Sequence, residues 1–91
     1  MTTPKLEELL NFPCPFTIKI MGKNVSELVP EICAIISIHA ADFEPERDIK
    51  IKQSSKGNYL AVDATINALS KAQLDSIYLA LNNHDLIKIT L

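Results

Sequence analysis

Apolar and polar residues alternate with a period of two in four stretches of the chain, a pattern typical of strands with one buried face. The first stretch covers residues 16–21, where Phe16, Ile18 and Ile20 share a face, and we expect Gly22 to end it. The second stretch covers residues 49–54, and residues 54–58 supply turn-forming side chains for a hairpin into the third stretch, residues 60–66. The chain ends in a fourth, residues 87–91, whose predicted core face consists of Ile87, Ile89 and Leu91.

Two stretches with helical spacing separate these strands. Asn24, followed three residues later by Glu27, resembles a capping box and predicts a helix over residues 24–41, with a first turn distorted by Pro30. A regular helix that begins near Pro30 is the alternative. Ser70 and Gln73 form a second capping pair and open a helix that ends at residues 82–83. Its apolar stripe consists of Leu74, Ile77, Tyr78 and Leu81.

The resulting element order is βαββαβ, which predicts an α+β fold of the ferredoxin-like type. In this sandwich a four-stranded antiparallel sheet carries two helices on one face and leaves the other face open. We expect one domain over residues 1–91, in which residues 1–15 form an N-terminal arm with a short helix. Pro13 and Pro15 flank Cys14 and favour an extended spacer into the first strand.

Composition narrows the class of protein. The 91 residues are 47% hydrophobic and 22% charged, which is too apolar for a disordered chain. Two cysteines without a pairing signature favour a reducing cytoplasm, and no apolar run is long enough for a membrane span. We therefore expect neither export nor a membrane anchor. The net charge of −2 supplies no general attraction for nucleic acid.

Two blocks of sequence resemble the YbeD-like family of small bacterial proteins. The first runs through residues 10–22 and contains Phe12, Pro13, Cys14 and Pro15; the second covers the hairpin at residues 54–59 and the strand to Ala68. The resemblance extends over essentially the whole chain, although Ala61 stands where relatives commonly carry serine. It implies a likeness to ACT domains, which sense small metabolites in metabolic enzymes, and a link to lipoate metabolism. It implies no established enzymatic activity.

Residues able to perform catalysis or hold a metal are sparse. His39 and His84 have no further ligand at metal-binding spacing, so we expect structural or solvated roles and no metal or other cofactor. Cys33 lies among apolar residues, and nothing near Cys14 in the sequence would lower the pKa of its thiol. We therefore expect a protein that is not an enzyme.

Two activities known for folds with this strand order are disfavoured. The loop after the first strand has one glycine and no arginine, unlike an acylphosphatase, because the single arginine is Arg47. An RNA-recognition motif needs stacking aromatic side chains on its third strand. In this chain Asn58 and Leu60 occupy those positions and Tyr59 is out of phase.

Three surfaces remain as candidates for binding. The open sheet face is expected to be basic and polar, and it could either be solvated or bind an acidic partner. Its residues are Lys19, Lys50, Lys52 and Lys88 with Thr17, Thr65, Thr90, Tyr59 and Asp63. On the first helix, Ile35 and Ile38 fall near the solvent side and suggest a contact for another protein or a second copy; burial by the arm of residues 1–12 is the alternative. The turn after the first strand could bind a ligand, as it commonly does in ACT domains, or its glycine could only satisfy a tight turn; it consists of Met21, Gly22, Lys23 and Asn24.

These surfaces support two hypotheses. In the first, the protein is a regulatory module that senses a small metabolite or docks on a metabolic enzyme. In the second, it is an adaptor or homo-oligomer that acts through the first helix.

Overall fold

The computed structural model describes residues 11–91. Four strands and two long helices follow the expected order, and a single helical turn, α3, precedes the second strand. In chain order the elements are β1 (Cys14–Lys23), α2 (Leu28–His39), α3 (Pro45–Asp48), β2 (Ile49–Gln53), β3 (Tyr59–Ala68), α4 (Lys71–Asn82) and β4 (Ile87–Thr90). The short helix expected in the N-terminal arm, from the helical spacing of Leu6, Leu9 and Leu10, lies outside the described residues.

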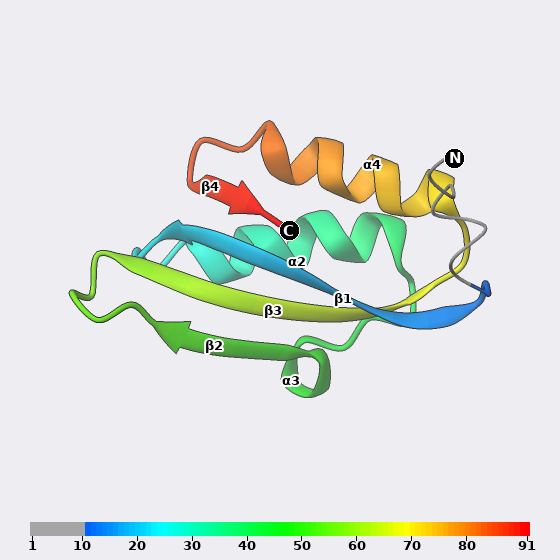
Figure 1. The fold of residues 1–91 in the computed structure, drawn as a ribbon, viewed down its shortest axis with the longest axis horizontal. Helices are drawn as coiled ribbons and strands as arrows, with labels where there is room; N and C mark the ends of the chain where they lie inside the picture. The colour runs from blue at the N-terminus through cyan, green and yellow to red at the C-terminus, as the bar shows by residue number, and fades with distance from the viewer. Residues whose placement is uncertain (1–10) are drawn as a thin grey trace, which may run out of the picture.

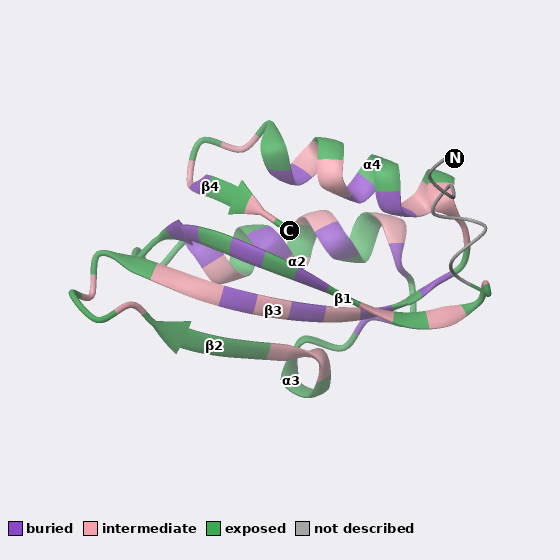
Figure 2. Ribbon diagram, in the orientation of Figure 1, coloured by how far each residue is buried: buried purple, intermediate pink, exposed green. Residues whose placement is uncertain are grey.

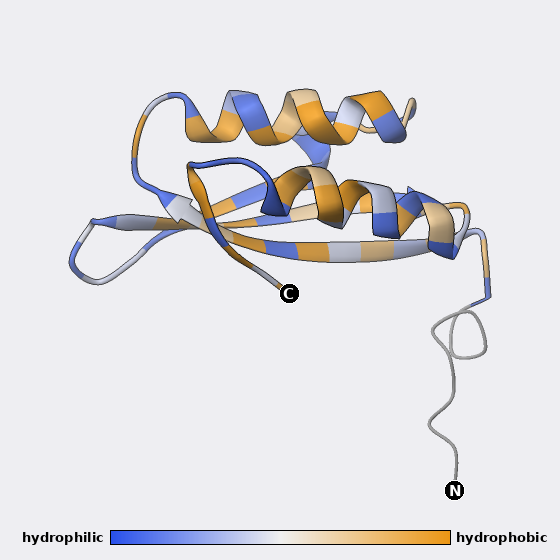
Figure 3. Cartoon of the chain, turned by 90° about the horizontal axis from the view of Figure 1, so that it is seen from above, coloured by the Kyte–Doolittle hydropathy of each residue, from blue (hydrophilic) through white to orange (hydrophobic). Residues whose placement is uncertain are grey.

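The strands form one antiparallel sheet in the order β2-β3-β1-β4. Helices α2 and α4 cover one face of this sheet and run side by side (Figures 1 and 3). No described helix covers the other face, so the ferredoxin-like prediction is confirmed.

The core lies between the sheet and the two helices. Even-numbered residues of β1 and β3 point into it, which gives both strands the banded burial seen in Figure 2. Each long helix adds three buried side chains at helical spacing. The buried residues are Ile18, Ile20, Leu28, Ile32, Ile36, Ala40, Phe43, Val62, Ala64, Ile66, Ala68, Leu74, Ile77, Leu81 and Ile87.

The start of α2 differs from the favoured prediction. The helix begins at Leu28, and Glu27 precedes it without a capping side-chain hydrogen bond. The Asn24 side chain instead donates from Nδ2 to the Gly57 carbonyl at 2.7 Å, so it holds the β2–β3 turn rather than capping the helix. Pro30 lies in the first turn, where a backbone N–H has no helical acceptor and its loss costs little. The alternative start near Pro30 is therefore the correct one.

Strand β1 is longer at both ends than the alternation predicted. It begins at Cys14, so Cys14 and Pro15 are paired strand residues rather than a spacer, and it continues to Lys23. Gly22 lies inside β1 and is buried. A Cβ atom at Gly22 would lie 2.5 Å from Leu28 Cδ1 and 2.7 Å from the Leu86 carbonyl oxygen. Close packing therefore accounts for this glycine.

The predicted cap of α4 is confirmed. Ser70 Oγ accepts a hydrogen bond from the Gln73 amide at 3.1 Å, and Gln73 Oε1 accepts one from the Leu69 amide at 2.7 Å. The other end of the Gln73 amide group donates to the His39 carbonyl at 2.8 Å. One side chain thus closes the start of α4 and ties it to the end of α2.

Strand β4 departs from its predicted single core face. Ile87 pairs with Gly22 and Ile89 pairs with Met21, so Lys88 is an extra residue at a bulge. Beyond the bulge, Ile89 shares a face with Met21, on the open side of the sheet. Thr90, expected on that side, pairs with core-facing Ile20 and donates to Asn82 of α4 at 2.9 Å.

Candidate functional site

The open face of the sheet contains a hollow of about 260 Å³. Its apolar walls come from three strands, with Met21 on β1, Ala61 on β3 and Ile89 on β4, and Leu91 lies just after β4. Ile89 is 51% exposed and Leu91 is 74% exposed, and together with Met21, which is 37% exposed, they form a contiguous apolar patch on the open face. The open face is therefore apolar at this point, contrary to the wholly polar surface expected from the sequence.

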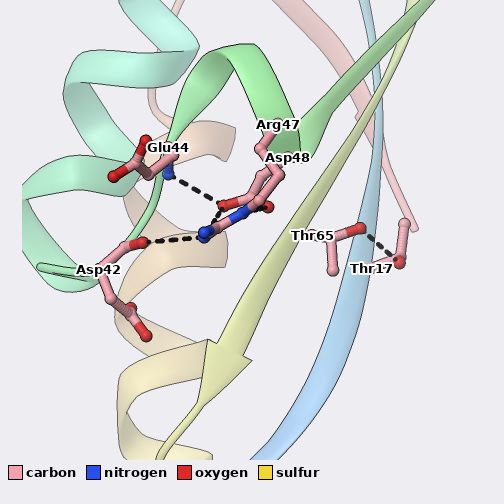
Figure 4. Close-up of polar contacts among 6 residues, drawn as sticks. All are labelled: Thr17, Asp42, Glu44, Arg47, Asp48 and Thr65. Carbon is pink, nitrogen blue, oxygen red and sulfur yellow. Dashed lines mark hydrogen bonds and ion pairs between the residues drawn. The ribbon is translucent and has the colours of Figure 1, made fainter.

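Charged and hydroxyl side chains border the hollow on the same face. Lys19 Nζ lies 3.5 Å from Asp63 Oδ2, and both residues also line the hollow. Two positions further along both strands, on the same face, the Thr17 and Thr65 hydroxyls are 2.9 Å apart (Figure 4). Because the ion pair is long and solvated, Lys19 can exchange Asp63 for another negative group at little cost.

The other predicted basic residues lie at the edges of the sheet. Lys50 and Lys52 are exposed on β2, and Lys50 is directly opposite Asp63. Lys88 is exposed at the β4 bulge, on the opposite edge. Tyr59 is exposed at the start of β3. The structure thus brings Lys19 together with Met21 but separates Lys88 from Lys50 and Lys52 by the width of the sheet.

Backbone amides at the predicted ligand turn donate hydrogen bonds to carbonyls of the same chain. The Lys23 amide donates to the Leu86 carbonyl at 2.9 Å, and the Asn24 amide donates to the Asn58 carbonyl at 3.1 Å. The Val25 amide also donates, to the Lys23 carbonyl. These amides therefore have acceptors already. Of the four predicted residues, Met21 is the one that lines the open-face hollow.

The surface of α2 exposes one large apolar side chain, that of Ile38. Ile38 is 78% exposed and Ala34 is also exposed. Ile35, in contrast, is half-buried and packs against the core. The exposed part of the predicted helix surface is thus centred on Ile38.

No cluster suited to a metal ion occurs in residues 11–91. His84 holds a loop: its Nδ1 accepts from the Leu86 amide at 3.2 Å, and its Nε2 lies 3.6 Å from Glu31 Oε2 of α2. Both cysteines are free thiols, and burial raises the pKa of Cys33, which disfavours the reactive thiolate.

A compact ion cluster surrounds the start of β2. Arg47 donates from Nε and Nη2 to the two carboxylate oxygens of Asp48, at 2.8 and 3.0 Å, and the Glu44 amide donates to the same carboxylate (Figure 4). The Arg47 hydrogen bond, and then that of the Glu44 amide, lowers the pKa of Asp48 below its ordinary value. A second hollow, of about 120 Å³, lies beside this cluster. Because the guanidinium is paired, the cluster closes the turn into β2 rather than offering a free cation.

Comparison with known proteins places the chain in a family. Residues 7–91 match the family described as "Protein of unknown function (DUF493)". The UPF0250 protein of Chromobacterium violaceum is 41% identical over 85 residues, which cover 93% of this chain and 94% of the relative. The UPF0250 protein YbeD of Salmonella arizonae is 43% identical over 88 residues, which cover 96% and 97%.

The chain belongs to this family. The resemblance to YbeD-like proteins is thereby confirmed, and the family description assigns no activity. Within residues 11–91, every helix is too short or too polar to cross a bilayer.

Sequence reasoning missed three residues of the apolar wall of the hollow, Ala61, Ile89 and Leu91. The alternation of Ile89 and Leu91 with Ile87 assigned both residues to the core. A bulge can move part of a strand to the other face, but the residues around Lys88 carry no local signal such as a glycine that would reveal it.

Proposed function

We propose that this protein is a cytoplasmic, non-catalytic regulatory module that binds a small metabolite or a metabolic enzyme on the open face of its sheet. The observation that carries the proposal is the hollow between Met21, Ala61, Ile89 and Leu91. Large apolar side chains that gather on an uncovered face are typical of binding surfaces.

The composition of the hollow indicates the chemistry of its ligand. Its volume of about 260 Å³ is slightly below the range of roughly 300–1,000 Å³ found for drug-sized ligands. This size suits a small metabolite or one or two side chains of a partner enzyme. The apolar walls favour an aliphatic group, and Lys19 at the border favours a carboxylate or another anion. The predicted link to lipoate metabolism makes lipoate one compound to test.

The test is an amide NMR titration of labelled protein with amino acids, lipoate, nucleotides and short RNA. We expect one compound class to shift the amides of Met21, Ala61 and Ile89. Ala61→Leu, which fills the hollow, should abolish these shifts. Asn67→Leu introduces the same side chain further along the open side of β3 and should leave them unchanged. Binding that survives Ala61→Leu would reject the hollow as the site.

A second candidate function is that of a homo-oligomer or adaptor that uses α2. The exposure of Ile38 favours it. Ile38→Asp should then reduce the oligomeric mass measured by light scattering, whereas Ser37→Asp adds the same charge at an exposed neighbour and should not. A wild-type mass equal to one chain would exclude the homo-oligomer, and partner capture that is unchanged in Ile38→Asp would count against the adaptor.

A further inference from the structure

The outer edge of β2 presents backbone groups that no other strand of the described chain pairs with. β2 is the first strand in the sheet order and, within the described residues, pairs only with β3 (Figure 1). The Ser54 amide donates to the Tyr59 carbonyl, and antiparallel pairing alternates from that point. Lys50 and Lys52 therefore direct their backbone groups to β3, and Ile51 and Gln53 direct theirs outward. The outward amide of Ile49 is already used, because it donates to the Pro45 carbonyl.

The side chains along this edge alternate between charge and apolar surface. Lys50 and Lys52 are exposed on the open face, and within residues 11–91 no carboxylate lies within ion-pair distance of either. Ile51 points to the opposite face, yet it is 52% exposed. An added strand would therefore meet two positive charges on one side and an apolar residue between them on the other.

We propose that the β2 edge binds an extended acidic segment of another protein by strand addition. The segment places two acidic residues, two positions apart, beside Lys50 and Lys52, and an apolar residue between them beside Ile51. Backbone hydrogen bonds to Ile51 and Gln53 supply affinity, and the side chains on both faces supply specificity. Opposite charges in adjacent strands attract, and like charges repel.

Charge also argues against a second copy as the occupant. Antiparallel self-pairing centred on Ile51 would place Lys50 of each copy opposite Lys52 of the other. Lysines on an edge strand ordinarily prevent such pairing. Here the same two charges reject a copy of the chain and neutral or basic strands while they admit an acidic one, so that repulsion provides selectivity.

The test uses two labelled seven-residue peptides, one of alternating glutamate and valine and one of alternating lysine and valine. We expect the acidic peptide to bind and to shift the amides of Ile51 and Gln53. Lys52→Glu should weaken its binding about fivefold, or ~1 kcal/mol. Lys56→Glu, with the same charge change in the adjacent turn, should leave binding unchanged.

Ile51→Pro separates strand addition from simple charge attraction. It removes an outward N–H and leaves the ladder to β3 intact, so the variant should fold and lose peptide binding. The proposal would be overturned if the two peptides bound equally well, or if the acidic peptide bound undiminished to folded Ile51→Pro. It would also be overturned if the wild type self-associated and Ile51→Pro abolished that self-association. The proposal is independent of the hollow, because ligand in the hollow shifts Ile89 instead of Ile51.

Discussion

Gly22 offers the sharpest test of how this fold is built. In Gly22→Ala the new methyl group would lie 2.5 Å from Leu28 Cδ1, a flexible side-chain end, and 2.7 Å from the Leu86 carbonyl oxygen, a backbone atom. Rotation of Leu28 can relieve the first contact. The second requires movement of the loop before β4, and that carbonyl already accepts the Lys23 amide at 2.9 Å.

The cost follows from these two contacts. Overpacking of a dense core costs about 1–3 kcal/mol, and weakening one backbone hydrogen bond adds about 1 kcal/mol. Replacement of glycine by alanine also lowers the conformational entropy of the unfolded chain, which offsets roughly 0.5 kcal/mol of this destabilisation. We expect Gly22→Ala to lower the free energy of unfolding by about 2 kcal/mol. For a chain of this length that corresponds to a fall in Tm of roughly 8–16 °C.

Urea and thermal unfolding, followed by circular dichroism, measure this change. Lys23→Ala, at the exposed neighbouring position, is the control and should alter stability by less than about 0.5 kcal/mol. A Gly22→Ala protein as stable as the wild type would refute the packing argument. If that stable variant also lost ligand binding, the glycine would instead belong to a ligand turn, as expected from the sequence.

Three further predictions follow from local contacts. Ser70→Ala removes the side-chain cap of α4 and should cost about 1 kcal/mol in urea unfolding, whereas Ser70→Asp should retain most of the stability. The pKa of Asp48 is lowered in the folded state, so its pairing with Arg47 stabilises the fold at pH values above the ordinary carboxyl pKa. This stabilisation is lost as the pH falls through the folded-state pKa. Asp48→Asn should therefore make the free energy of unfolding less dependent on pH in the acid range. Ile87→Ala should cost about 2–4 kcal/mol and Ile89→Ala less than about 1 kcal/mol, where equal losses would contradict the bulged register of β4.

The layered fold was predictable because two kinds of signal agree in the sequence. One face of the sheet is uncovered, so β1 and β3 show clear alternation, and the second helix has both a cap at Ser70 and an apolar stripe. Each signal depends on residues within a few positions of one another. Short-range patterns of this kind are sufficient to assign strands, helices and their order.

The errors arise where a distant residue decides the local structure. Asn24 resembles a helix cap, but its side chain bonds to Gly57, 33 residues along the chain. Gly22 resembles the end of a strand, but the close approach of Leu28 and Leu86 explains it. Contacts of this range are invisible to spacing arguments. The candidate ligand turn was inferred from residue types that the fold also uses for packing and pairing, and ligand binding there stays a prediction.

The bulge at Lys88 connects the fold to the candidate site. Without the bulge, regular alternation along β4 would turn Ile87, Ile89 and Leu91 to one face, and burial of an isoleucine or leucine side chain is worth about 1.5–3 kcal/mol. With it, Thr90 faces α4 and bonds to Asn82, while Ile89 lies opposite Met21 and Leu91 opposite Lys19 on the open face. The register of β4 thus forgoes apolar burial on the helix side and builds a hollow on the open face. An arrangement that leaves so much apolar surface uncovered is better explained by a bound partner than by stability, which makes this hollow, rather than the turn at Gly22, the site where we expect a ligand.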